Sequence, residues 1–150
     1  MKKLLVLIFI LFSVNLTYAQ LVAREEMKIK VEGICDNNNV YVLYNGWDGQ
    51  VEAKCSLSNE DIQKMLNQID FFKNNPNFKG KGMVSVYINC KGEPIGWKIS
   101  VKTNAELDKQ LLEVFQTFTE WTTGTLNNKN VDSVQLISYK IKSGIVFERH

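Results

Sequence analysis

Three cysteines are the residues of this chain with the most reactive side chains. Cys35, Cys55 and Cys90 could form a disulfide, bind a metal or supply a thiolate nucleophile. A nucleophilic thiol needs a base beside it, yet the chain has a single histidine, His150, which is its last residue. Histidine triads and His-rich metal sites therefore lack their central residue. We expect no enzyme, no cofactor and no metal site.

Two pairs of carboxylates could in principle share acid–base chemistry. Glu60 with Asp61, and Glu106 with Asp108, both stand where a helix is expected to begin. Acidic residues are favoured there because the helix dipole places partial positive charge at the N-terminus. We therefore assign these carboxylates a structural role.

The first nineteen residues have the pattern of a secretory signal peptide. Lys2 and Lys3 precede an apolar run at residues 4–14, and Thr17 and Ala19 fit the small positions of a cleavage site before Gln20. The alternative is an uncleaved membrane anchor, but a membrane span needs about 20 apolar residues. We predict that residues 1–19 are removed, with export to the periplasm or cell envelope and no membrane insertion after processing.

Export places the cysteines in an oxidising compartment, where disulfides persist. We predict a bridge between Cys35 and Cys55, because both end strand-like runs within one local segment. Three cysteines cannot all pair within one chain, and either pairing with Cys90 remains an alternative. A further alternative is that all three are buried and reduced, acting as small apolar residues.

The charge balance argues against nucleic acid as a partner. The chain has 18 Lys and Arg against 16 Asp and Glu, and 45% of its residues are hydrophobic. Removing Lys2 and Lys3 leaves the two signs equal in number. A nucleic-acid binder needs a basic excess to neutralise phosphates, and none is present.

Residues 20–81 are predicted to form a β-meander followed by a helix. Strands are expected at residues 27–35, 40–44 and 51–55, and Ser58 is a suitable N-cap for a helix that ends near Phe72. Trp47 lies between Asn45-Gly46 and Asp48-Gly49, in a turn that cannot easily bury an indole. We therefore predict that Trp47 is an exposed contact residue.

Residues 82–150 are predicted to form a second unit with the order strand, strand, helix, strand. Alternating residues around a glycine-containing turn indicate a hairpin at residues 84–101. Thr103 and Glu106 match a capping box for a helix at residues 105–118, and residues 131–141 make a long strand. The expected fold is α+β, an antiparallel sheet packed by one or two helices.

This second unit resembles the C-terminal domain of TonB-type energy transducers over about 60 of the 150 residues. Residues 82–88 resemble the family's first strand, and residues 91–93 resemble its hairpin turn. Residues 121–124 resemble its Trp-x-Pro-Gly motif, and residues 128–131 its Gly-Lys-Pro-Val motif. The chain has no Pro-rich spacer, so we expect a stand-alone exported relative of the Bacteroidetes type.

The resemblance implies a protein-binding module linked to TonB-type transport. Such domains bind an extended peptide of an outer-membrane receptor, or of another envelope protein, by adding a strand to the sheet. The implied edge is residues 131–141, with Ser133, Gln135, Ile137 and Tyr139 on one face. The alternative is an envelope protein that self-associates through this edge as a homodimer. A further alternative is that this edge is covered within the chain, by residues 145–147 or by the N-terminal meander.

Overall fold

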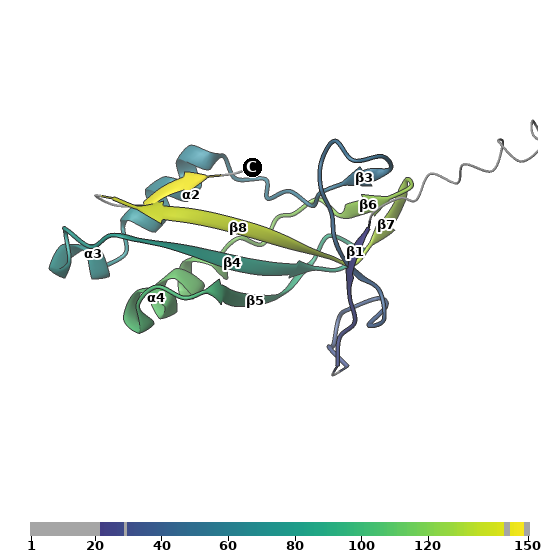
Figure 1. Cartoon of the computed structure of the whole chain (residues 1–150), viewed down its shortest axis with the longest axis horizontal. Helices are drawn as coiled ribbons and strands as arrows, with labels where there is room; N and C mark the ends of the chain where they lie inside the picture. The colour runs from purple at the N-terminus through teal and green to yellow at the C-terminus, as the bar shows by residue number, and fades with distance from the viewer. Residues whose placement is uncertain (1–21, 29, 143–144, 149–150) are drawn as a thin grey trace, which may run out of the picture.

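The computed structural model describes residues 22–28, 30–142 and 145–148, so the predicted signal peptide lies outside the described residues. Long strands run the length of the molecule, with the helices gathered at one end and the N-terminal strands at the other (Figure 1). The α+β class expected from the sequence is confirmed. Within the described ranges, no helix is both long and apolar enough to span a bilayer.

Three strands form the centre of the larger sheet. β4 (Gly80–Ile88) pairs antiparallel with β5 (Pro94–Val101) on one side and with β8 (Ser133–Ile141) on the other. The β4–β5 hairpin turns at Gly92, whose φ of 85° favours glycine. The order across the sheet is β1-β2-β8-β4-β5, and β9 (Ile145–Glu148) also pairs with β8. The predicted hairpin is therefore confirmed, and β8 is paired on both sides.

The helices pack on one face of this sheet. α2 (Asn59–Asn67) begins after Ser58, whose side chain accepts the N–H of Asp61 as predicted, and α3 (Phe71–Asn74) follows as a separate turn. α4 (Ala105–Phe115) supplies Leu107, Leu111 and Phe115, spaced as expected for one apolar face. The core comprises sixteen buried residues: Ala53, Cys55, Ile62, Leu66, Ile69, Phe71, Val84, Val86, Ile88, Leu107, Leu111, Phe115, Phe118, Ile137, Tyr139 and Ile141.

The cap of α4 differs from the predicted capping box. Asn104 is the N-cap and accepts the backbone N–H groups of Glu106 and Leu107. Thr103 instead donates its backbone N–H and its hydroxyl to the carboxylate of Asp108, with an Oγ1–Oδ1 distance of 2.6 Å. Asp108 is buried, and these bonds satisfy its charge.

The strand predicted at residues 27–35 does not form. Its place is taken by a short strand, β1 (Ala23–Glu25), followed by a loop that includes Gly33 at φ 87°. The backbone N–H of Val31 donates to the side chain of Asn37, and Met27 N–H donates to the Asn37 carbonyl. The asparagine turn therefore binds the backbone of this segment in place of a neighbouring strand.

The predicted meander is also wrong, because its strands join different partners. β2 (Val40–Val42) pairs antiparallel with β1 and parallel with β8, through the single pair Tyr41 and Ser133. β3 (Gln50–Val51) joins a second sheet with β6 (Gly124–Leu126) and β7 (Lys129–Val131). The predicted boundary at residues 81 and 82 falls inside β4, and residues from both sides of it build one core.

Candidate functional site

The two edges of the larger sheet differ in how well they are protected against the addition of another strand. On the β5 side, the strand starts with Pro94, carries the exposed Lys98 and shows two register shifts against β4. Proline, lysine and irregular pairing are features that discourage a second strand from adding to an edge. The β5 edge is therefore blunted by its own sequence.

The edge of β8 that faces away from β4 is covered by two short segments. β2 meets it at Ser133, and β9 pairs with it antiparallel from Ser138 to Ile141. Between these contacts, residues 134–137 are in register with β4 but with no other strand among the described residues. We call residues 134–137 the open stretch of β8. The predicted edge strand is thus partly covered. The N-terminal part of the chain covers it through β2, and the C-terminal residues cover it through β9.

The side chains predicted to bind a partner on β8 mostly face the core. Ser133, Ile137 and Tyr139 are buried, on the sheet face that packs against the helices. Gln135 is half-buried, and its Nε2 donates to Glu52 Oε2 at 3.3 Å. Because side chains alternate along a strand, Leu136 points to the opposite face, where it is 39% exposed. A partner at this edge would therefore meet Leu136 and the backbone rather than Ser133, Ile137 or Tyr139.

The residues predicted to bind a partner do not include Leu136, although the sequence carries a signal for it. Residues 134 and 136 are apolar on the face opposite Ile137, Tyr139 and Ile141. A strand that is apolar on both faces needs a partner on each face or at its edge.

Tyr139 packs directly over Gly82. A Cβ built on Gly82 would lie 2.2 Å from the Tyr139 hydroxyl oxygen, so only glycine leaves room for this ring. Burial raises the pKa of Tyr139 to about 12; the hydroxyl of Thr103 opposes this rise, and the carboxylate of Asp108 adds to it. The residue therefore acts as a neutral core side chain.

Trp47 lies in the loop between β2 and β3 and is 45% exposed. Its ring centroid is 5.5 Å from that of Tyr44, which is also exposed. The loop is fixed by bonds from Gln50 N–H to the Trp47 carbonyl and from Tyr44 N–H to the Gln50 side chain. Trp47 is thus held outward on an ordered loop, and its role as a contact residue stays a prediction.

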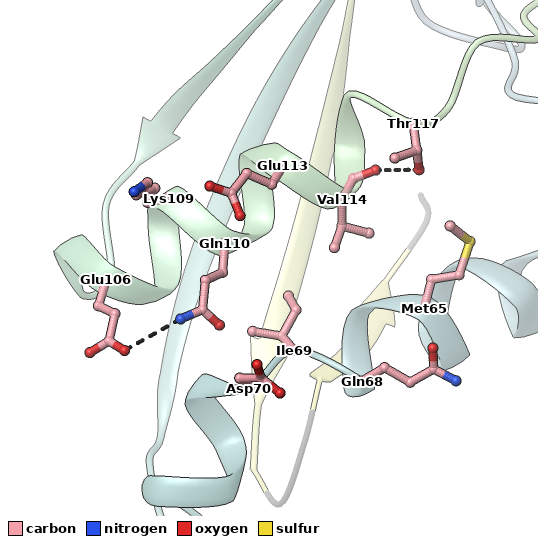
Figure 2. Close-up of a pocket in the computed structure, with 10 residues that line it drawn as sticks. All are labelled: Met65, Gln68, Ile69, Asp70, Glu106, Lys109, Gln110, Glu113, Val114 and Thr117. Carbon is pink, nitrogen blue, oxygen red and sulfur yellow. Dashed lines mark hydrogen bonds between the residues drawn. The ribbon is translucent and has the colours of Figure 1, made fainter.

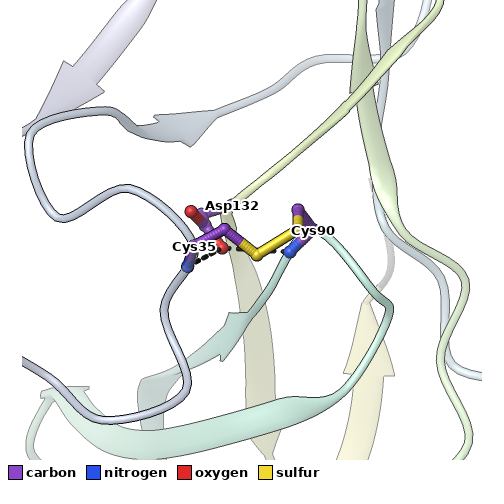
Figure 3. A group of neighbouring side chains, drawn as sticks. All are labelled: Cys35, Cys90 and Asp132. Atoms are coloured by element: carbon purple, nitrogen blue, oxygen red, sulfur yellow. Dashed lines mark hydrogen bonds between the residues drawn. A yellow bond between two sulfur atoms is a disulfide. The ribbon is translucent and has the colours of Figure 1, made fainter.

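The disulfide joins Cys35 to Cys90, so the predicted pairing of Cys35 with Cys55 is wrong (Figure 3). The two Cα atoms of the bridge are 6.1 Å apart. The prediction failed because β2 and β3 do not pair, and the loop before β2 lies instead against the β4–β5 turn. Cys55 is a free, buried thiol in the core. Its backbone forms an isolated antiparallel β-bridge with Trp121.

Asp132 is the third member of the cluster in Figure 3. Its buried carboxylate accepts the backbone N–H groups of Cys35, Asp36 and Cys90, at 3.1, 2.7 and 3.0 Å. Its backbone carbonyl accepts the N–H of Tyr41 in β2. One residue between β7 and β8 therefore holds the N-terminal loop and the β4–β5 turn together.

The same three residues are a group whose ligand atoms lie within 4.8 Å of one another. Metal binding by cysteine requires free thiolates. Here the two sulfur atoms are bonded to each other, and the carboxylate oxygens already accept three N–H groups. The arrangement is therefore a structural crosslink supported by a buried carboxylate.

A groove of about 730 Å³ lies between α2 and α4 (Figure 2). Gln110 stands at one end, where its Oε1 accepts the N–H of Phe71 and its Nε2 donates to Glu106. The lining mixes Met65, Ile69 and Val114 with side chains of both charges, and Asp70 is paired with Lys73 at 2.6 Å. The groove thus has side chains of both charges and one exposed carboxamide, Gln68, which is a weak set of groups for orienting a ligand.

Comparisons with known proteins gave no match to this chain among family models, curated proteins or solved structures. The resemblance to TonB-type C-terminal domains therefore rests on the residues quoted above and stays a prediction.

Proposed function

We propose that this chain is an exported binding module of the periplasm or cell envelope, related to TonB C-terminal domains and linked to TonB-type transport. Its partner is an extended peptide of an outer-membrane receptor or another envelope protein. The peptide adds as a strand to β8, on the side away from β4. The observation that carries the proposal is the half-covered edge of β8.

The geometry of β8 supports strand addition in three ways. Every second residue of a paired strand directs its N–H and C=O away from its neighbour, so the open stretch offers backbone groups to a partner. The pairing of β9 shows that this edge accepts an antiparallel strand. The exposed Leu136 supplies an apolar contact beside that backbone. Backbone bonds give such an interface affinity, and alternate side chains give it selectivity.

β9 acts in this proposal as a removable cover. It pairs with four residues of β8, whereas β4 pairs with all nine. A peptide that extends the line of β9 would pair with the open stretch. One that replaces β9 would pair from the open stretch to Ile141. An uncovered edge invites aggregation, so a cover that a partner can displace is a reasonable solution.

The disulfide supports the export part of the proposal, because disulfides persist in an oxidising compartment. N-terminal sequencing of the mature protein tests this part directly, with Gln20 expected as the first residue. An intact Met1 in the membrane fraction would contradict cleavage.

Site-specific photo-crosslinking in the native envelope tests the binding edge. A photoreactive amino acid replaces Leu136 in one variant and Val101, on the blunted β5 edge, in the control; the two side chains are 39% and 46% exposed. We expect an adduct with an outer-membrane protein from position 136 and none from position 101. Equal adducts at both positions, or none at 136, would contradict the proposal.

Self-association is the alternative, favoured by the same open stretch. Two copies could pair β8 with β8 across a two-fold axis, because an isologous interface uses one surface twice. An adduct of twice the chain's mass from position 136, with a dimer in light scattering of the purified protein, would select this alternative.

A further inference from the structure

We propose that the Cys35–Cys90 bridge is a site of thiol–disulfide exchange with a dithiol partner, and that its reduction loosens β2 from β8. The exchange and the loosening stand on the geometry of the bridge alone. The consequence for binding rests on the proposed function, because it concerns the β8 edge.

The bridge is open to attack from one side. Cys35 is exposed, Cys90 is half-buried and Asp132 is buried beneath them. Cys35 is the more exposed of the two cysteines, so we infer that a thiolate from solvent attacks its sulfur. In-line attack there breaks the Cys35–Cys90 bond, forms a mixed disulfide with Cys35, and releases the sulfur of Cys90, which takes up a proton.

The second thiol of the partner completes the exchange. It attacks the mixed disulfide on the partner's own sulfur and releases Cys35, which is protonated in turn. Two electrons and two protons pass to the bridge, and the dithiol becomes a disulfide. A monothiol would need a second equivalent for the same result, whereas a dithiol reduces the bridge in one encounter, so a dithiol is the class of partner that we propose.

Few other contacts hold the segment that the bridge secures. We call residues 22–28 and 30–44 the N-terminal arm. β1 pairs only with β2 in the described part of the chain, and β2 meets β8 through one residue pair. The remaining contacts include the bonds to Asp132, one from the side chain of Asn89 to the Gly33 carbonyl and one from the Tyr44 N–H to the Gln50 side chain, and the burial of Val40 and Leu43.

Reduction removes the single covalent link among these contacts. The bridge joins residues 55 positions apart in the sequence, and without it the arm is free to open more often. The bonds to Asp132 remain, so the arm loosens rather than detaches.

The loosened strand is the one that limits the open stretch. β2 contacts β8 at Ser133, directly before residues 134–137. Each time the loosened β2 opens, the free edge of β8 extends to its first residue, Ser133. The redox state of the bridge would thereby set the length of edge that a peptide can occupy.

Amide hydrogen exchange of the full chain tests the loosening. The oxidised protein, the protein treated with dithiothreitol under native conditions, and a Cys35→Ala/Cys90→Ala variant are compared, all in a Cys55→Ala background so that no other thiol exchanges. We expect the Tyr41 amide to exchange at least tenfold faster in the last two samples, with α4 amides changed less than twofold. Equal acceleration in α4, no acceleration at Tyr41, or a bridge that resists dithiothreitol without denaturant would each overturn the proposal.

The link to binding has its own readout. Photo-crosslinking from position 136 in the native envelope is repeated in the Cys35→Ala/Cys90→Ala variant, with at least a twofold higher yield expected. An unchanged yield would overturn the regulatory part. Absence of any adduct, in the variant and the parent alike, would count against the proposed function. The amide hydrogen exchange rates would still test whether reduction of the bridge loosens β2.

Discussion

β4 and β2 both pair with β8, yet they are held in very different ways. β4 matches β8 along all nine of its residues, and both strands contribute to the same buried core as α4. β2 matches β8 at one residue, and a disulfide and one buried carboxylate secure the arm around it. Many similar contacts therefore hold the central sheet together, whereas only a few contacts of different kinds hold the arm in place.

The largest effect is expected from a cavity in the central sheet and its helix. Leu111 is fully buried on α4, so Leu111→Ala should lower the free energy of unfolding by about 2–5 kcal/mol. Urea unfolding measures this loss, with Val101→Ala as the control because Val101 is exposed on β5. The control should stay within about 0.5 kcal/mol. A similar small loss for Leu111→Ala would mean that this helix face is not core.

In the arm, the largest single effect should come from Asp132. Asp132→Asn would place an amide NH₂ group near three N–H donors and remove the charge that they face. We expect a loss of about 2–3 kcal/mol, because hydrogen bonds to a charged acceptor are the stronger ones. Urea unfolding of the oxidised protein measures it, and Glu113→Gln on the exposed side of α4 is the matched control. Equal stability of both variants would show that the carboxylate does not hold the arm.

The same contrast explains what the sequence could predict. The hairpin of residues 84–101, the start of α2 and the apolar face of α4 follow from neighbours a few positions apart, and all three are confirmed. Local patterns suffice there because each element can be recognised from its own period. The long strand predicted at residues 131–141 follows from the same local pattern, and it forms as β8 from Ser133 to Ile141.

The arm could not be predicted because its contacts join distant residues. Asp132 appeared to be one position in a long strand, but it separates β7 from β8 and binds residues 96 and 97 positions away. The cysteine pairing depended on which strands meet, and the parallel contact of β2 with β8 has no local signal. The burial of Tyr139 likewise requires Gly82, which lies on the neighbouring strand.

Alkaline pH should affect the central sheet through Tyr139. A tyrosine whose pKa rises from 10.0 to about 12 on folding contributes stability that is complete below pH 10 and is lost as the pH rises towards 12. At pH 11 this loss is about 1 kcal/mol. Tyr139→Phe should remove that part of the pH dependence, whereas Tyr44→Phe in the exposed loop should keep it. Urea unfolding at pH 9 and pH 11 measures both, and identical slopes for the two variants would contradict the burial of Tyr139.

The smallest effect is expected at the exposed surface of the arm. Asp36 accepts the side-chain N–H of Asn39 at 2.6 Å and the backbone N–H of Asn38 at 3.0 Å, and Arg24 lies nearby. These hydrogen bonds, the one from Asn39 foremost, hold the pKa of Asp36 below its usual 3.8. A lowered pKa stabilises the folded turn above pH 3.8, and that contribution is lost as the pH falls through the lower folded value. NMR titration of the carboxyl group should therefore give a midpoint below 3.8 in the intact protein, and Asn39→Ala should raise it towards 3.8. Because the group is exposed, the core resonances of α4 should not respond; a response there would mean that the arm and the central sheet are coupled more tightly than their contacts indicate.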